Sequence, residues 1–428
     1  MLETVFDDRT EHQQPDAIGP HPDTLSTFLW NAIIERATDV HLHCTEAGLR
    51  VLYRIDGMVH PRIVLPERQG RKLLNQIKTA AGLNAVRSFV PLEGQIHLPH
   101  GDHQRDIRVT LTPIRNRESA HLRFLTLATD QWSLSSLGLL EADQNRISDT
   151  LHTQSGLVLI TGGTGSGKTT TLYSLASSMD LSATTAYSIE DPVEFNLPFA
   201  QQIEVDERHG LTMHEGLRTI LRMDPDLILI GEIRDRDSAT VAARAALSGK
   251  LVLATIHAQD APGAVDSLHY LGVPSHIIGT ALRSVIAQNL LRKLCDCCAQ
   301  SGPPTQQEQE LFSSHGVKIP ETLKRPTACV ECNSYGYRGR TGIFEIMTPD
   351  AECRQLICRG VHHDELTDFL QQQGTRSVAH DGLTKVAEGV TSTEELQRVC
   401  QLTAASSFEP LKHSPDTALQ VEPAAAGQ

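Results

Sequence analysis

Aromatic residues and long apolar runs are scarce in this chain. Phe, Trp and Tyr make up 4% of its 428 residues, which is little material for the stacking platforms that hold single-stranded nucleic acids. No stretch approaches the roughly 20 apolar residues of a membrane-spanning helix, so we expect no direct membrane insertion. The opening stretch MLETVFDDRTEHQQPD is acidic and has no apolar centre, so we expect no secretory signal there.

Positive charge is also in short supply. Lys and Arg number 38 against 52 Asp and Glu, which gives a formal net charge of −14. This balance argues against a nucleic-acid coat and against general affinity for anionic lipid. The nine cysteines follow no disulfide framework and indicate a reducing compartment.

The length and the 39% hydrophobic content predict two or three globular domains. Residues 1–22 are polar and proline-broken, and we expect a disordered lead-in. Residues 23–126 mix helical and alternating patterns and predict a small α+β domain, followed by a linker at 127–140. In this domain we expect helices at 25–37 and 71–81 and strands at 39–43, 48–54, 95–98, 106–110 and 120–125.

Strands and helices alternate from residue 155 onward, which predicts a parallel sheet with helices on both faces. This α/β domain is expected to span residues 141–402, before a disordered tail at 403–428. We expect its strands at 156–161, 185–189, 227–230 and 251–256, and further helices at 211–222, 236–247, 264–294 and 351–400.

A glycine-rich run fits the phosphate-cradling pattern G-x-x-x-x-G-K-[ST]. It follows a short apolar strand and precedes a helical pattern, so backbone N–H groups and the helix N-terminus would meet an anion. Lys168 is expected to reach the β- and γ-phosphates of ATP, and the Thr169 hydroxyl to ligate Mg²⁺. A Gly/Ser/Thr turn that matches by chance is the alternative. The run consists of Gly162, Gly163, Thr164, Gly165, Ser166, Gly167, Lys168, Thr169 and Thr170.

Carboxylates follow two of the predicted strands. Glu232 comes directly after the buried run 227–230 and Gly231, where ligands bind in such sheets. We expect Glu232 to orient or deprotonate the attacking water. Glu190 and Glu194 flank a proline-fixed acidic turn, which a neighbouring Mg-nucleotide would stabilise. The alternative for either carboxylate group is a solvated acidic residue.

A histidine, His257, ends the next strand. It fits a satisfied polar residue of the core as well as a sensor of the γ-phosphate, and both interpretations stay open.

Two C-x-x-C pairs, Cys295 with Cys298 and Cys329 with Cys332, are separated by thirty residues. Four thiolates at this spacing predict a structural Zn²⁺ site, in a metal subdomain at 295–332 whose intervening segment reads as a loop. Cys297 lies inside the first pair, but the spacing favours Cys295 with Cys298. Unpaired buried thiols are the alternative.

Together these motifs resemble the type II secretion and type IV pilus assembly ATPases. The order of the P-loop, SIEDPVE, GLRTILRMDPDLILIGEIRD, ATIHAQDA, IAQNLLRKLC and GYRGRTGIFEI is very like theirs, and the likeness runs over about residues 25–400. ATDVHLH, YRIDG, PLEGQ and DIRVTLTPIRNRESAHLRFL resemble the family's nucleotide-covering domain. The resemblance implies a RecA-like ATPase domain after a small PAS-like α+β domain.

The resemblance also implies site roles. Glu232 would be the Walker B glutamate, Glu190 and Glu194 would assist nucleotide and Mg²⁺ handling, and His257 would sense the γ-phosphate. Arg108 and Arg123 match small-domain arginines that close over the phosphates, since guanidinium groups neutralise charge developing on phosphoryl oxygens. Arg54 lies in the same domain.

The resemblance further implies a cytoplasmic homo-hexamer, recruited peripherally to the inner membrane by a polytopic platform protein and driving pilin or pseudopilin assembly. The tetracysteine pattern favours assembly and secretion members over pilus retraction ATPases. The extra N-terminal domain of secretion ATPases would be missing or reduced to residues 1–22. Two rival functions remain: a nucleic-acid translocase or conjugation-type ATPase on a related core, and a nucleotide-dependent scaffold.

Overall fold

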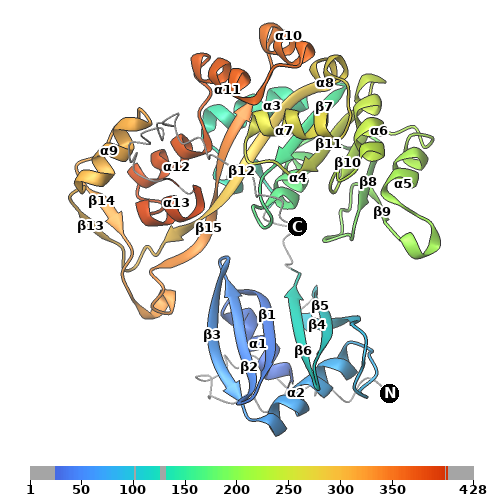
Figure 1. Cartoon of the computed structure of the whole chain (residues 1–428), viewed down its shortest axis with the longest axis vertical. Coiled ribbons are helices and arrows are strands. Elements are labelled where there is room, and N and C mark those ends of the chain that lie inside the picture. The colour runs from blue at the N-terminus through green and yellow to red at the C-terminus, as the bar shows by residue number, and fades with distance from the viewer. Residues whose placement is uncertain (1–24, 101–102, 126–131, 401, 403–428) are drawn as a thin grey trace, which may run out of the picture.

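The computed structural model describes residues 25–100, 103–125, 132–400 and 402. The predicted lead-in at 1–22 and tail at 403–428 lie outside these residues. A small domain of strands and helices lies at the bottom of Figure 1, and a larger α/β domain lies above it. Among the described residues, no helix combines the length and the apolar character needed to cross a bilayer.

The small domain is a six-stranded antiparallel sheet with the strand order β3-β2-β1-β6-β5-β4. All the strands predicted here are present. Its helices are α1 (Leu25–Ile34) and α2 (Glu67–Ala80), and its strands are β1 (Ala37–Thr45), β2 (Gly48–Ile55), β3 (Met58–Leu65), β4 (Leu92–His100), β5 (His103–Ile114) and β6 (Arg117–Phe124).

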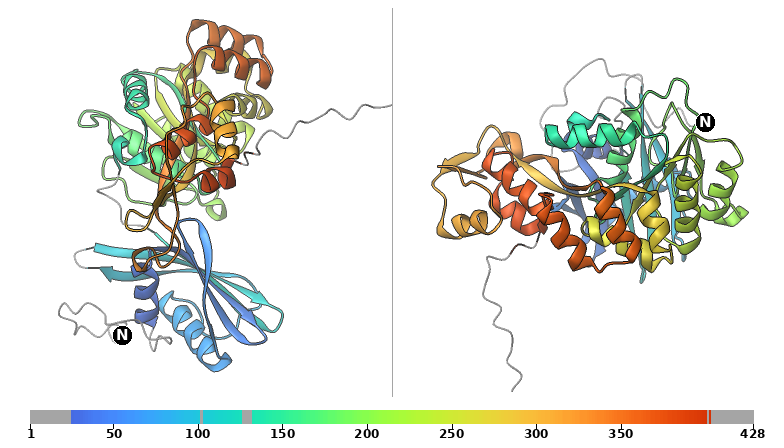
Figure 2. Two further views of the ribbon diagram at one scale, coloured as in Figure 1. Left: turned by 90° about the vertical axis from the view of Figure 1, so that its left-hand side faces the viewer. Right: turned by 90° about the horizontal axis from the view of Figure 1, so that it is seen from above.

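Alternation along these strands separates an apolar face from a polar one. Val40, Leu42 and Leu122 belong to the buried core that includes residues of α1 and α2. Figure 2 shows both helices on the side of the sheet away from the α/β domain. The polar residues between the core positions therefore lie on the opposite face, which is the face toward the α/β domain.

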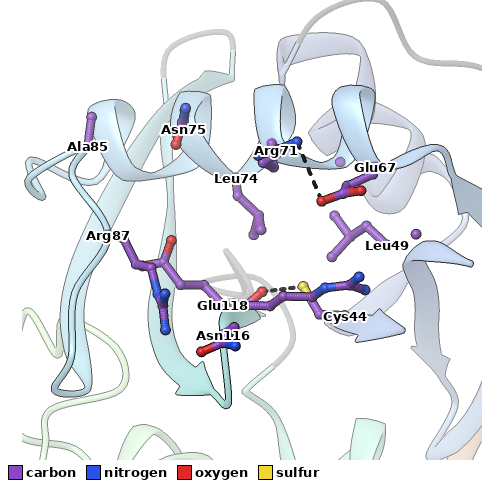
Figure 3. Close-up of a pocket in the computed structure, with 13 residues that line it drawn as sticks. Cys44, Leu49, Glu67, Arg71, Leu74, Asn75, Ala85, Arg87, Asn116 and Glu118 are labelled. Atoms are coloured by element: carbon purple, nitrogen blue, oxygen red, sulfur yellow. Dashed lines mark hydrogen bonds and ion pairs between the residues drawn. The ribbon is translucent and has the colours of Figure 1, made fainter. Parts of the chain in front are cut away.

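A buried ion pair lies on the helix-covered side of this sheet. Lys78 in α2 is fully buried, and its Nζ lies 2.6 and 2.7 Å from the two carboxylate oxygens of Glu118. A cavity of about 360 Å³ lies beside Glu118, and Figure 3 shows α2 with Arg71 and Leu74 along one wall and Cys44 near Glu118 on the other. The Cys44 thiol donates to the Glu118 carbonyl at 2.5 Å.

The large domain contains a seven-stranded sheet with the order β15-β12-β7-β11-β10-β8-β9. Neighbouring strands from β12 to β9 are parallel, and β15 adds antiparallel to β12 at one edge. The predicted parallel sheet is confirmed, with this antiparallel edge as an addition. The strands are β7 (Gly156–Thr161), β8 (Ala186–Glu190), β9 (Gln201–Glu204), β10 (Leu227–Ile230), β11 (Leu251–Ile256), β12 (Leu282–Leu294) and β15 (Tyr337–Met347).

Helices cover both faces of this sheet, as predicted. Leu157 and Leu159 of β7 belong to the core with α5 to α8, α10 and α11, while Val158 and Ile160 belong to the core with α3 and α4. The helices are α3 (Glu141–Leu151), α4 (Lys168–Ser177), α5 (Met213–Ile220), α6 (Arg236–Leu247), α7 (Ala261–Tyr270), α8 (Ser275–Ala281), α10 (Ala351–Arg359) and α11 (His363–Gln372).

The prediction of helix throughout residues 264–294 is wrong in its second half. Helix α7 ends at Tyr270 and α8 ends at Ala281, and Leu282–Leu294 forms β12. Its leucines suit a helix by intrinsic propensity, but tertiary context overrides propensity when a segment is buried between other strands. Pairing with β7 and β15 satisfies its backbone, and the buried Ser284 hydroxyl donates to the Met347 carbonyl.

The ends of β12 and β15 leave the main sheet and enter a separate cluster at the left of Figure 1. Its core joins these strands to three helices. The segment between the cysteine pairs is not simply a loop, because it forms β13, β14 and α9. The elements are β13 (Gln300–Gly302), α9 (Gln306–Ser314), β14 (Leu323–Arg325), α12 (Val378–Ala387) and α13 (Thr393–Cys400).

Within the described residues, contacts between the small domain and the large one are found at two places. The rings of His60 and Tyr335 stack with their centroids 3.9 Å apart, and the Asp56 carboxylate accepts the Gly339 N–H at 2.9 Å. At the other place, Arg108 Nη2 donates to the Val193 carbonyl at 2.7 Å. These contacts position the polar face of the small sheet over the α/β domain.

The buried Lys78–Glu118 pair yields a stability prediction. We expect Glu118→Ala to destabilise the small domain by about 3 kcal/mol, because an uncompensated buried ammonium remains. Hydrogen exchange of the α2 and β6 amides in urea would measure it. Glu67→Ala, which removes an exposed pair with Arg71, serves as the control and should cost less than about 1 kcal/mol. Equal effects of the two substitutions would contradict the assignment.

Candidate functional site

The glycine-rich run forms a tight loop between β7 and α4. All six residues of β7 are buried, and α4 begins at Lys168. Gly162 has a φ of +148°, and a Cβ there would lie 2.3 Å from the Gln288 carbonyl oxygen. Gly167 caps the helix in the left-handed region. The loop therefore needs glycine for its shape, as an anion cradle does.

Lys168 and Ser166 show how this loop is suited to a phosphate. Lys168 Nζ donates to the carbonyls of Gly162 at 2.9 Å and Gly163 at 3.2 Å. Burial lowers the pKa of Lys168, and the charge of Glu232 opposes that shift. The buried Ser166 hydroxyl has no protein partner among the described residues. A cationic side chain over a glycine cradle fits a nucleotide phosphate, and Thr169 beside it fits Mg²⁺.

The Glu232 carboxylate lies between the side chains of His257 and Arg234, just after β10. His257 Nε2 is 2.6 Å from Glu232 Oε1, and Arg234 Nε donates to the other carboxylate oxygen. Arg234 Nη1 also lies 3.1 Å from Asp191 Oδ2. The structure thus brings together Glu232 and His257, which the sequence placed at the ends of neighbouring strands.

Glu190 differs from Glu232 because its carboxylate is buried and already occupied. It accepts hydrogen bonds from Tyr173 Oη, from Ser188 Oγ at 2.7 Å and from Gln202 Nε2 at 3.0 Å. Burial and the Glu190 charge raise the pKa of Tyr173. Glu194, in contrast, is half-buried and lines the cavities described next.

Two cavities with a shared wall lie between the domains. The smaller, of about 320 Å³, joins Arg108 and Arg123 of the small domain to Lys168, Glu232 and His257. The larger, of about 650 Å³, runs from the P-loop to Arg54, Asp39 and Arg340. Both are lined by Arg123, Thr164, Gly165, Lys168, Thr169 and Glu194.

Several residues at this site carry no motif of their own. Gln288 of β12 donates from Nε2 to the Ser166 carbonyl at 2.6 Å and so supports the P-loop from behind. Arg340 of β15 reaches the larger cavity. Both lie in segments that resemble the secretion ATPases, but their roles depend on strand pairing that the sequence did not reveal.

The four predicted zinc ligands form a compact cluster. Their sulfur atoms all lie within 4.8 Å of one another. Sγ–Sγ distances of 3.7 Å for Cys295–Cys329, 3.8 Å for Cys298–Cys332 and 3.6 Å for Cys329–Cys332 match the roughly 3.8 Å edges of a tetrahedron with Zn–S bonds of about 2.3 Å. The Gly336 N–H donates to Cys332 Sγ at 3.2 Å. The donor set therefore fits a structural zinc ion.

A P-loop on a mainly parallel sheet, a carboxylate after a neighbouring strand and an arginine-bearing domain above define a P-loop ATPase of two-domain architecture. The family model described as "Type II/IV secretion system protein" matches residues 15–398. The chain belongs to this family and is an ATP-hydrolysing enzyme of the secretion and pilus motor class.

Curated relatives support this assignment. The chain is 36% identical over 391 residues to a putative type II secretion system protein E of Escherichia coli K12, covering 91% of this chain and 79% of the relative. It is 38% identical to type II secretion system protein E of Pseudomonas aeruginosa, covering 88% and 74%. It is 35% identical to type II secretion system ATPase E of Vibrio cholerae, with the same coverage.

Solved structures show the same fold. The Legionella pneumophila ATPase DotB superimposes with a TM-score of 0.66 at 20% identity, covering 90% of this chain and 97% of that one. The pilus retraction motor PilT with bound ADP gives a TM-score of 0.58 at 22% identity, covering 91% and 99%.

The cysteine cluster yields a metal prediction. We expect about one zinc per chain by elemental analysis, lost in the variant Cys329→Ser/Cys332→Ser because two of four ligands are removed. Cys297→Ser is the matched control, since Cys297 is exposed and outside the cluster, and it should keep its zinc. Freshly purified protein without zinc would refute the site.

Proposed function

We propose that this chain is the cytoplasmic motor ATPase of a type IV pilus or type II secretion machine. It would act as a homo-hexamer, recruited peripherally to the inner membrane, where a polytopic platform protein receives its motion and pilin or pseudopilin subunits are assembled. The supporting observation is the 320 Å³ cavity that joins Lys168 and Glu232 to Arg108 and Arg123 of the other domain. The hexamer, the platform and the PAS-like character of the small domain stay predictions from the resemblance.

The P-loop would bind the phosphates of ATP. Its backbone N–H groups and Lys168 would hold the β- and γ-phosphates, while Thr169, with help from Glu194, would hold Mg²⁺, which neutralises phosphate charge when bound. Thr170 lies at the wall of the larger cavity. Glu190 would act less directly, because its carboxylate is occupied by Tyr173 and Ser188. We propose that it holds the acidic turn in place.

Glu232 and His257 form the hydrolytic pair in this proposal. Glu232 would orient the attacking water or take its proton, and His257, 2.6 Å from it, would report whether a γ-phosphate is present. Arg234 holds the second oxygen of Glu232, which fixes the carboxylate plane. A positioned base of this kind contributes about 10²- to 10⁴-fold to a rate.

The arginines would couple chemistry to motion. Arg108 and Arg123 line the same cavity as the P-loop from a different domain, and they would stabilise charge on the transferred phosphoryl group. ATP then favours the closed arrangement of the domains only through its differential contacts with these arginines. Opening after hydrolysis would move the small domain, and the zinc-bearing subdomain that touches it through Tyr335 and His60.

A nucleic-acid translocase is the second candidate, since the resemblance extends to conjugation-type cores. The charge of −14 and the 4% aromatic content speak against it. A scaffold that binds nucleotide without hydrolysing it is a third candidate, and it conflicts with the family assignment.

Glu232→Gln tests the hydrolytic role. We expect kcat to fall by about 10²-fold or more, because the amide cannot accept the proton, while the Kd for Mg-ATP stays within about threefold. Steady-state phosphate release and calorimetry would measure the two quantities.

Glu215→Gln is the control, since Glu215 is an exposed residue of α5, and it should keep normal turnover. A Glu232→Gln variant with normal kcat would refute the proposed mechanism, and pure folded protein without affinity for Mg-ATP would refute the motor itself.

Nucleic acid tests the rival function. We expect single-stranded or duplex DNA to change the ATPase rate by less than about twofold at low and moderate salt, because a chain with a net charge of −14 attracts phosphates weakly. DNA stimulation that weakens steeply as salt rises would favour the translocase instead.

A further inference from the structure

Four charged residues form one row across the polar face of the small sheet. In the strand register, Arg54 of β2 lies opposite Asp39 of β1, Asp39 lies opposite Arg123 of β6, and Arg123 lies opposite Arg108 of β5. Neighbouring strands are about 4.8 Å apart, and directly opposed residues point to the same face. Asp39 is therefore the single carboxylate in a row that otherwise contains three guanidinium groups.

Asp39 is buried and well supplied with donors. Its Oδ1 accepts from Arg123 Nε and from His121 Nε2, both at 3.0 Å. Its Oδ2 accepts from Thr38 Oγ1 at 2.9 Å and lies 3.9 Å from Arg54 Nε. Burial alone would raise the pKa of Asp39, but the bonds from His121 and Arg123 outweigh it and hold the pKa well below its usual value. Asp39 is thus an anion throughout the physiological pH range.

The hydrogen bond to Asp39 leaves the terminal nitrogens of Arg123 available to a ligand. Arg123 bonds Asp39 through Nε, so its two terminal nitrogens can serve phosphoryl oxygens. Arg123 lines both cavities, and Arg54 and Asp39 line the larger one together with the P-loop. Without Asp39, the positive charge of Arg123 would face that of Arg108 on the neighbouring strand with no carboxylate to offset it, and the long side chains would sample many rotamers.

We propose that Asp39 is a positioning residue for ATP hydrolysis, which fixes Arg123 and steadies Arg54 in the row that faces the P-loop. This inference rests on the proposed role of Arg123 at the phosphates. Under this proposal, Asp39 does not contact the reacting atoms. Asp39 holds the arginine side chains in place before the nucleotide binds. Less conformational entropy is then lost when these side chains contact the transition state.

The test uses the full chain and the isosteric variant Asp39→Asn. We expect kcat to fall about 10- to 100-fold, because loss of the charge releases the guanidinium from its catalytic position. The Kd for Mg-ADP should change by less than about threefold. In an Arg123→Ala background, Asp39→Asn should have little further effect on kcat, since the group that it positions is gone.

Glu118→Gln is the matched control for a loss of domain stability. Glu118 is also a partly buried, ion-paired carboxylate of the same sheet, but it lies on the opposite face beside Lys78. This variant should lower the melting temperature while kcat stays normal at temperatures where the chain is folded. Asp39→Glu provides a second test if Asp39→Asn does not fold, because it keeps the charge but displaces the carboxylate, and we expect reduced kcat.

The outcomes distinguish a failure of the positioning role of Asp39 from a failure of the proposed function. Normal kcat in Asp39→Asn or Asp39→Glu, with Arg123→Ala impaired, would overturn the inference and leave the proposed function intact. Independent, multiplicative effects of Asp39→Asn and Arg123→Ala would also overturn it, since Asp39 would then act by another route. Normal kcat in Arg123→Ala would remove the phosphate role of Arg123 and this inference with it.

Discussion

A site for a polyanion needs positive charge around it, and in this structure both domains contribute cationic side chains to the cavity. The α/β domain offers Lys168, the P-loop amides and the N-terminus of α4, while Arg108 and Arg123 come from the polar face of the small sheet. Since Coulomb interactions strengthen when water is excluded, the site is most effective when the two domains are together. The polar front of the small sheet, opposite its helix-covered back, is the surface that carries these arginines.

Two carboxylates around the site hold neighbouring side chains in place through ion pairs and hydrogen bonds. Glu232 is held by His257 and Arg234, and Asp39 by Arg123 and His121. Each carboxylate holds one arginine, Arg234 or Arg123, in place, and that arginine lowers the cost of burying the carboxylate. Glu190 is the exception, because neutral hydroxyl and amide donors satisfy it.

Much of the fold could be predicted because the decisive signals are local. The apolar strand before the P-loop, the strand before Glu232 and the paired cysteines each carry their meaning within a few residues. Strand β12 could not be predicted, since its leucine-rich sequence suits a helix and only burial between β7 and β15 makes it a strand. Asp39 could not be identified either, because its partners Arg54 and Arg123 become neighbours only through the strand register.

Strand β12 links distant parts of the molecule mechanically. Its first half is bonded to β7, whereas from Gln288 onward it pairs with β15 only, so that the far half is a two-stranded ribbon about 20 Å long, packed against α12 and α13. Gln288 at its root touches the P-loop through Ser166, and its tip runs directly into Cys295 of the sulfur cluster. A displacement of Gln288 together with the P-loop would be passed along this ribbon to the cysteine cluster, and the packing of α12 and α13 against the ribbon would limit its size.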